Sequence, residues 1–227
     1  MDYCNARWLT PGLEIDAMLW DAWIFRIENG IGGNPMSLTA EKYTVEQVLR
    51  QMSREEAFEL WQSLPAPTEG EVQGEYHGHV HDGGDPAVRA AKTEFFYHSP
   101  CGYWLGKAYH RGAEGKGEGY NYFRQSDGSV RRYRRFATEI GPSILDGRPA
   151  LIMYYRAFDN YAGKMDLVDE IRCLDDGAYL CTYTGTETVE GFCTKLPGQA
   201  RTEPELFALT GPSSPWVGVN DPQKELL

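Results

Sequence analysis

The sequence predicts a mainly β protein, an antiparallel β-barrel preceded by N-terminal helices. Beyond residue 70, short runs rich in aromatic and β-branched residues alternate with turn residues at regular spacing, a pattern typical of a sandwich or barrel. Asp127-Gly128 and Asp176-Gly177 stand between adjacent runs, where glycine supplies the positive φ of a hairpin turn without strain. Before residue 65 the apolar residues recur at helical spacing instead.

The N-terminal segment, residues 1–68, is expected to be helical. One helix is predicted over residues 12–28, where apolar residues including two tryptophans share one face. Two shorter helices are predicted within residues 44–64. Their starting stretches, 44–47 and 53–56, each fit a capping box, in which a hydroxyl and a later amide or acid satisfy backbone donors reciprocally.

The barrel is expected to occupy residues 70–210. Its strands are predicted near residues 72–81, 93–99, 103–110, 119–125, 129–137, 150–157, 166–174, 178–185, 189–195 and 204–210. The Pro- and Ser-rich tail, 211–227, is expected to be irregular. The whole chain, residues 1–227, is of a length that suits a single domain.

Composition and charge exclude several classes of partner. The chain has 227 residues, of which 41% are hydrophobic, and a net charge of −11, so nucleic acid is not an expected partner. No apolar run is long enough to span a membrane, and the N-terminus lacks the features of a signal peptide. Five cysteines without a C-x-x-C spacing favour reduced thiols and a cytoplasmic location. These features of the sequence are compatible with a monomer and with a homodimer.

Four stretches in order suggest a family. Residues 74–78, GEYHG, resemble the GXWXG motif with Tyr76 in place of tryptophan, and residues 104–109, WLGKAY, resemble W-x-G-K-x-F. Met153-Tyr154-Tyr155 and the stretch 169–176 resemble the M-x-Y-D and D-x-F-R-x-x-D-D elements. The chain is therefore similar to the GXWXG-type proteins of unknown function. The resemblance implies a lipocalin- or calycin-like barrel and assigns no activity.

One strand carries three histidines. His77, His79 and His81 alternate, so a regular strand would place all three on one face, where they could bind zinc. Tyr76 has the opposite phase. If Tyr76 fills the barrel interior, the histidines point outward, so we expect no bound metal.

A set of candidate site residues follows from the motifs and from strand phase. Asp169 and Tyr154 are predicted as catalytic acid/base residues, with His110 near the mouth of the barrel as a further base. A structural carboxylate is the alternative for Asp169. The predicted substrate-binding residues are Trp104, Tyr76, Lys107, Tyr109 and Arg172.

Strand phase limits which of these residues can share the cavity. On a regular strand Lys107 and Tyr109 face away from Trp104, so only one of these sets should line the interior. Asp169 and Arg172 are likewise of opposite phase, so they cannot both face inward.

The leading hypothesis is a cofactor-free isomerase, cyclase or lyase that acts on a small hydrophobic organic molecule. No phosphate-binding loop, dinucleotide fingerprint or nucleophile elbow is present in the sequence, so no cofactor is expected. The alternatives are a non-catalytic carrier of a hydrophobic ligand and a metal-dependent enzyme on the histidine strand. Convergence of two or more titratable side chains inside the barrel would favour the enzyme over the carrier.

Overall fold

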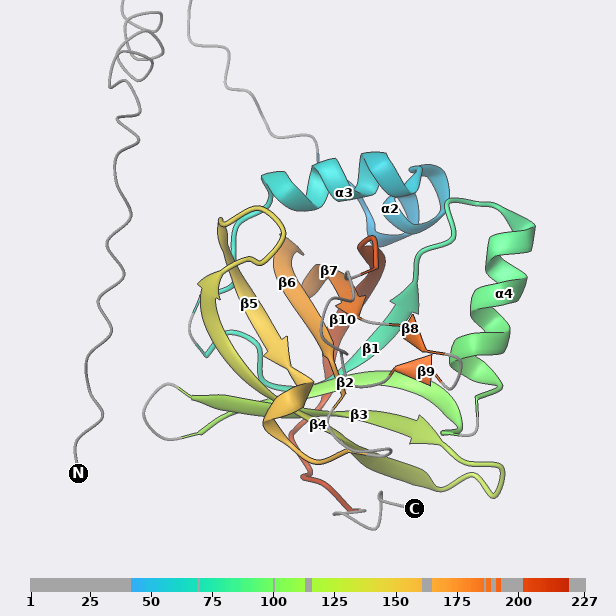
Figure 1. Ribbon diagram of the computed structural model, residues 1–227, viewed down its shortest axis with the longest axis vertical. Coiled ribbons are helices and arrows are strands. Elements are labelled where there is room, and N and C mark those ends of the chain that lie inside the picture. The colour runs from blue at the N-terminus through green and yellow to red at the C-terminus, as the bar shows by residue number, and fades with distance from the viewer. Residues whose placement is uncertain are drawn as a thin grey trace, which may run out of the picture. The chain divides into compact units, whose positions relative to one another are not determined.

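A computed structural model describes residues 42–68, 70–99, 101–112, 116–160, 165–185, 187–188, 191–192 and 202–220. The helix expected over residues 12–28 lies outside these residues, and the single domain over 1–227 stays a prediction. Eight strands form a closed antiparallel barrel in the order β1-β10-β7-β6-β5-β4-β3-β2 (Figure 1). The mainly β fold class and the barrel, consistent with a lipocalin-like architecture, are thus confirmed.

The barrel strands follow the predicted runs closely. They are β1 (Gly74–Val80), β2 (Tyr103–Arg111), β3 (Gly117–Arg124), β4 (Val130–Pro142), β5 (Pro149–Tyr154), β6 (Leu167–Asp175), β7 (Ala178–Gly185) and β10 (Glu205–Ser214). Both Asp-Gly turns join neighbouring strands, and their glycines, Gly128 and Gly177, have φ of 83° and 63°. A three-residue 3₁₀ turn, η2 (Tyr155–Ala157), follows β5 directly.

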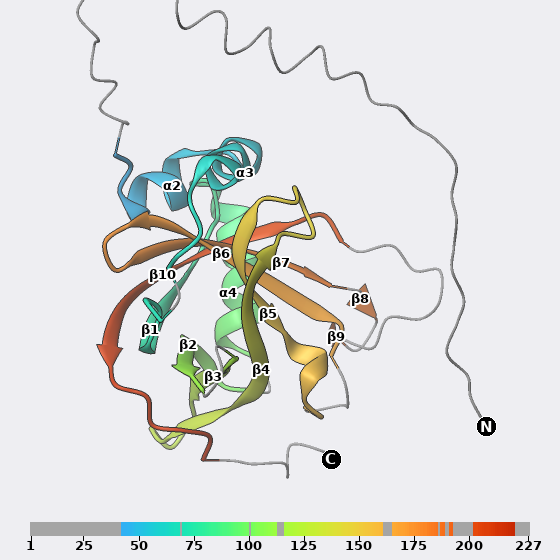
Figure 2. The same ribbon diagram turned by 90° about the vertical axis from the view of Figure 1, so that its left-hand side faces the viewer.

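Two helices cover part of the outer face. Helices α2 (Val45–Gln51) and α3 (Arg54–Ser63) begin at the two capping boxes, which are fully formed at Thr44 and Ser53. Trp61 of α3 packs on Leu180 and Leu206 from β7 and β10. Figures 1 and 2 show both helices lying on the same side of the barrel.

The strand predicted at residues 93–99 is wrong, because this stretch belongs to helix α4 (Pro86–Tyr97). Asp85 caps the helix by accepting hydrogen bonds from the amides of Ala87 and Val88, and Pro86 occupies the first turn, where its missing N–H costs nothing. The aromatic residues at the end of the helix favour a strand by composition, but the cap at Asp85 and the proline after it start a helix that continues through them. Helix α4 lies across the end of the barrel at which β3 finishes (Figure 1).

The last predicted segments also differ from expectation. Of the strand predicted at residues 189–195, the structure describes Gly191–Phe192, which form the short β9 and pair with β8 (Glu187–Thr188) outside the barrel. The tail expected to be irregular from 211 continues β10 through Ser214. Asn220 then bonds to the backbone of β4, so the described part of the tail ends on this strand. Among the described residues, no helix is long and apolar enough to cross a membrane.

Candidate functional site

A bulge in β2 brings two sets of side chains into the barrel. The pairing with β3 shifts between Trp104 and Gly106, so Leu105 is an extra residue on this strand. Trp104 and Lys107 both face the interior as a result, and Tyr109 follows at the next inward position. The expectation that only one of these sets lines the interior is therefore wrong, because strand phase changes at the bulge.

Glycine makes this arrangement sterically possible. Gly106 has φ of +148°, and a Cβ there would lie 1.9 Å from the carbonyl oxygen of Tyr76. Gly78 of β1 faces the indole of Trp104, whose nearest ring atom would be 2.2 Å from an added Cβ. The aromatic interior thus needs glycine at two places where backbone and ring approach closely.

Four polar side chains meet inside the barrel, and we call them the central cluster: Lys107, Asn121, Tyr155 and Asp169. Lys107 Nζ lies 2.8 Å from Asp169 Oδ2 and donates to Asn121 Oδ1 at 2.9 Å and to the Tyr155 hydroxyl. The Tyr155 hydroxyl donates to Asp169 Oδ2 at 3.1 Å and accepts from Asn121 Nδ2 at 2.9 Å. Each of these residues is at most 5% exposed.

Three strands and one turn supply the central cluster. Lys107 on β2 stands opposite Asn121 on β3, and Asp169 on β6 stands opposite Met153 on β5. Tyr155 enters from η2, directly after β5. Asn121 Nδ2 also bonds the carbonyl of Arg134, a non-glycine residue held at φ 57° where β4 bulges. A strained residue of this kind is found where the surroundings hold a site in place.

The environment of the central cluster is aromatic. The rings of Trp104, Phe136, Tyr155 and Phe207 have their centroids 5.2–5.8 Å from Lys107 Nζ. Trp104 also donates through Nε1 to Asn121 Oδ1 at 3.1 Å. An ammonium taken out of water keeps favourable electrostatics here through ring faces as well as through oxygens.

Burial shifts the pKa of each titratable group in the central cluster, namely Lys107, Tyr155 and Asp169. Desolvation lowers the pKa of Lys107, although the Asp169 carboxylate opposes this. Desolvation raises the pKa of Asp169, with Lys107 and Tyr155 opposing. Burial, reinforced by the charge of Asp169, raises the pKa of Tyr155 well above its ordinary value. The shifts of Lys107 and Asp169 bring the two groups closer to sharing one proton, while Tyr155 keeps its phenolic hydrogen.

One carboxylate oxygen of the central cluster accepts no hydrogen bond from the described residues. Asp169 Oδ1 is buried and has no hydrogen-bond partner among the described residues, while Oδ2 carries the bonds to Lys107 and Tyr155. A buried carboxylate oxygen without a donor is costly, and such groups call for an explanation. A ligand that presents a polar or acidic hydrogen to Oδ1 would supply the missing partner.

A cavity of about 350 Å³ opens at the end of the barrel opposite α4. Tyr109 and Leu151 form its inner wall, and His110, Arg111 and Glu139 are among its polar lining residues. The Tyr109 hydroxyl donates to Met153 Sδ at 3.2 Å, so these two side chains lie between the cavity and the central cluster. His110 is exposed at this end and stacks on Trp216, in keeping with its predicted place near the mouth.

The placement of Tyr154 differs from prediction. Tyr154 faces outward with Ala150, Ile152 and Val168, so it does not share a cavity with Trp104 and Asp169. Strand alternation explains the difference, since Met153 points inward, Tyr154 outward and the next residue inward again. Tyr155 therefore occupies the position beside Asp169 that was assigned to its neighbour.

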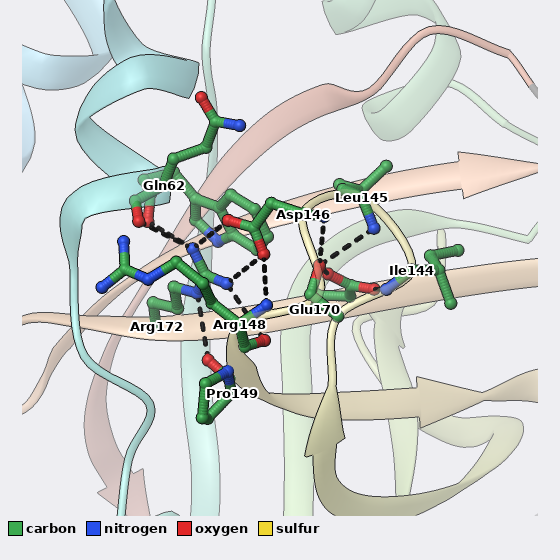
Figure 3. Close-up of polar contacts among 10 residues, drawn as sticks. Gln62, Ile144, Leu145, Asp146, Arg148, Pro149, Glu170 and Arg172 are labelled. Atoms are coloured by element: carbon green, nitrogen blue, oxygen red, sulfur yellow. Dashed lines mark hydrogen bonds and ion pairs between the residues drawn. The ribbon is translucent and has the colours of Figure 1, made fainter. Parts of the chain in front are cut away.

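Arg172 lies outside the barrel and joins it to α3. Its guanidinium makes two hydrogen bonds to Asp146, both 2.7 Å long, and further bonds to the carbonyls of Trp61, Gln62, Arg148 and Pro149 (Figure 3). Its Cζ lies 4.0 Å from the centroid of the Trp61 ring. The opposite phase of Asp169 and Arg172 is confirmed, so Arg172 does not line the barrel interior with Asp169, and its substrate-binding role stays a prediction.

The remaining predicted residues lie as follows. Tyr76 is buried in the interior, edge-on to Tyr109 and Tyr179. His79 and His81 bond to Thr210 and to the carbonyl of Met52, outside the barrel, as the phase of Tyr76 implies. Within the described part of the chain, no three His, Cys, Asp or Glu side chains are grouped as metal ligands would be.

Fold and site together define a closed eight-stranded barrel with a buried, titratable cluster at its centre. No family model and no curated protein matches the chain. Among solved structures, the crystal structure of a protein from Thermomonospora curvata is similar with 18% identity over 71% of this chain and 88% of that chain, at a TM-score of 0.44. This likeness is too weak to transfer fold or function, so the resemblance to GXWXG-type proteins stays a prediction.

Proposed function

We propose that this barrel is a cofactor-free enzyme that moves a proton on a small, largely apolar organic molecule, in a reaction of the isomerase, cyclase or lyase type. The observation that supports it most is the convergence of Lys107, Asp169 and Tyr155 within hydrogen-bond distance inside the barrel. A carrier for a hydrophobic ligand needs only a single polar anchor, whereas contacting titratable groups suit acid/base chemistry.

Each residue of the central cluster has a role in this proposal. Asp169 acts as the base, because Oδ1 has an unused lone pair and burial raises its pKa towards the working range of a proton acceptor. Tyr155 remains protonated and donates a hydrogen bond to the oxygen on which charge develops. Lys107 supplies positive charge at the same place, and Asn121 orients both donors.

The substrate is expected to enter through the cavity opposite α4. Its volume, about 350 Å³, suits a small molecule, since ligand sites of this class begin at about 300 Å³. Tyr109 and Met153 separate the cavity from the central cluster. Rotation of the Tyr109 side chain would connect this cavity to the central cluster, and the aromatic wall would hold an apolar substrate against Asp169 Oδ1.

Deuterium exchange tests this function without knowledge of the natural substrate. The protein is screened in D₂O against small ketones, enones and phenols, and NMR follows the loss of acidic C–H signals. We expect exchange with the wild-type protein and its loss in Asp169→Asn, normalised to folded protein. Tyr155→Phe, which removes only the hydroxyl, should slow exchange by about 10²–10⁴-fold, the usual contribution of an acid or base group.

The other outcomes are equally informative. Compounds that bind to the barrel without exchange in the wild-type protein would indicate the carrier instead. Exchange that persists in both variants would show that the central cluster is not the site. Tyr154→Phe serves as the matched control, because this neighbouring tyrosine faces outward and its loss should leave exchange unchanged.

A further inference from the structure

The geometry points to Lys107 as a nucleophile that forms an imine with an aldehyde or ketone, so that the substrate of the central cluster is a carbonyl compound. This inference rests on the proposed function and names its substrate class. Three features support it: the seclusion of the Lys107 amine, the groups placed to move its proton, and the apolar wall around it.

Two Lys–Asp pairs of this chain differ only in their surroundings. Lys107 Nζ and Asp169 Oδ2 are 2.8 Å apart with side chains 5% and 1% exposed, while Lys42 Nζ and Asp175 Oδ1 are also 2.8 Å apart but 79% and 49% exposed. Water stabilises the charged form of the exposed pair. The buried pair lacks this solvation, so its neutral form, with a free amine and a protonated carboxyl, costs far less.

The groups that face Lys107 are suited to proton movement. Asp169 and Tyr155 both contact Nζ, and Asp169 can take the ammonium proton directly. Arg134 of β4 also acts on the amine through its charge and disfavours the ammonium. Cys181 of β7 faces the amine as a neutral thiol, because burial raises its pKa well above the ordinary value, so Asp169 is the principal counter-ion.

The wall around the amine indicates what kind of carbonyl compound fits. Aromatic rings surround Nζ, and Phe207 and Phe136 are buried and carry no polar group. Such a surface binds an aromatic or alicyclic body, while a charged phosphate or carboxylate would remain without water in this space. The expected substrate is therefore an uncharged aldehyde or ketone with a ring next to or near the carbonyl.

The reaction balances without any further reactant. Asp169 takes a proton from the Lys107 ammonium, and the nitrogen lone pair attacks the carbonyl carbon to form a C–N bond. Tyr155 passes its hydrogen to the carbonyl oxygen and regains one from the nitrogen, which gives a neutral carbinolamine. Asp169 then returns its proton to the carbinolamine hydroxyl, the C–O bond breaks, and water leaves while the nitrogen lone pair forms the C=N bond of an iminium, so that Asp169 is ionised again. Asp169 Oδ1 can afterwards remove an acidic hydrogen next to the imine carbon.

Reductive trapping tests the inference. The full chain is incubated at pH 7 with benzaldehyde or cyclohexanone and sodium cyanoborohydride, and the labelled lysines are located by peptide mass spectrometry. An imine reduced to a secondary amine adds the mass of the carbonyl compound less one oxygen. We expect Lys107 to be labelled at least about tenfold more than Lys42, because each unit of pKa lowering raises the neutral amine fraction about tenfold.

Controls separate this inference from simple access. The preference should vanish in guanidinium-unfolded protein, where all lysines are equivalent. In folded Asp169→Asn, labelling of Lys107 should show a pH profile moved to lower pH, since a group that raises the amine pKa is gone. Benzyl alcohol, which has the ring but no carbonyl, should slow labelling by competition without forming an adduct.

The result that overturns the inference is equal labelling of Lys107 and Lys42 in the folded chain, or none at Lys107. If such a chain still catalyses deuterium exchange, the proposed proton transfer stands and only the imine is lost. If exchange is absent as well, both the imine and the proposed function fail.

Discussion

Replacing Asp169 by asparagine probes the energetics of the central cluster most sharply. Among the described residues, Asp169 is the carboxylate that contacts the Lys107 ammonium. Removing one partner of a buried ion pair typically costs about 3–5 kcal/mol. The loss has a ceiling at pH 7, because Lys107 can release its proton instead. Moving a lysine from its ordinary pKa of about 10.4 to neutrality at pH 7 costs about 4.6 kcal/mol, at about 1.36 kcal/mol per unit.

The same reasoning gives a pH dependence. In Asp169→Asn the amine pKa falls further, so the unfolded chain binds more protons than the folded one, and the stability of the variant rises with pH up to the unfolded value. The ceiling falls to about 1.9 kcal/mol at pH 9. We therefore expect a loss of about 3–4.6 kcal/mol at pH 7, or roughly 6–18 °C in Tm, that shrinks clearly by pH 9.

Urea unfolding of wild type and variant at pH 7 and pH 9 measures this difference. Asp175→Asn is the matched control, because Asp175 lies on the same strand at the same distance from a lysine but at the surface. Its loss should leave stability almost unchanged, since exposed ion pairs contribute little. A loss in Asp169→Asn of under about 1 kcal/mol at pH 7 would refute the reasoning, and so would a loss that is equal at both pH values.

Three further predictions concern the frame around the site. Gly106→Ala should lower the free energy of unfolding by about 3 kcal/mol or more, since the added Cβ would overlap a backbone oxygen. Gly128→Ala, also at positive φ but with open space around it, should lower it by about 1–2 kcal/mol in the same urea unfolding assay. Arg172→Lys should lower stability by about 3–5 kcal/mol by leaving carbonyls and a carboxylate unpaired, and a fall in deuterium exchange per folded molecule would contradict its purely structural role. Burial disfavours ionisation of Glu75, but hydrogen bonds from Arg132 and other donors outweigh this and lower its pKa. The stability that ionised Glu75 contributes is present above about pH 4.3 and is lost as pH falls through the lower pKa of the folded state. The Tm difference between wild type and Glu75→Gln should therefore shrink towards pH 3, and a difference that stays constant would count against this role of Glu75.

Most of the fold can be predicted from the alternation of apolar and polar residues along the strands and from the residues at the turns. The Asp-Gly hairpins and the inward phase of Tyr76 are local signals, and the structure agrees with them. The helix at 86–97 also has a local start signal in Asp85 and Pro86, which the strand prediction did not take into account. Here a start signal is better guidance than composition, because the cap determines where the first hydrogen bonds form.

The central cluster was predictable only in part. Lys107 and Asp169 stand in motifs, but their strands, β2 and β6, lie on opposite sides of the closed barrel, so their meeting across its interior depends on the barrel closing. The bulge at Leu105 cannot be read from the residues around it, because it depends on pairing with β3. Asn121 was missed since it lies in no motif; its only signal was a lone polar residue at an inward position between Tyr120 and Tyr122, in an otherwise aromatic run.

Lys107 and Asp169 form a proton-sharing pair inside a closed barrel. NMR titration of lysines labelled with ¹³C at Cε, with Lys107 assigned by its loss in Lys107→Met, measures this directly. We expect Lys107 to titrate below the ordinary lysine value of about 10.4, and lower still in Asp169→Asn, while Lys42 titrates above it. If Lys107 titrates at or above the value of Lys42, the two buried groups do not share a proton.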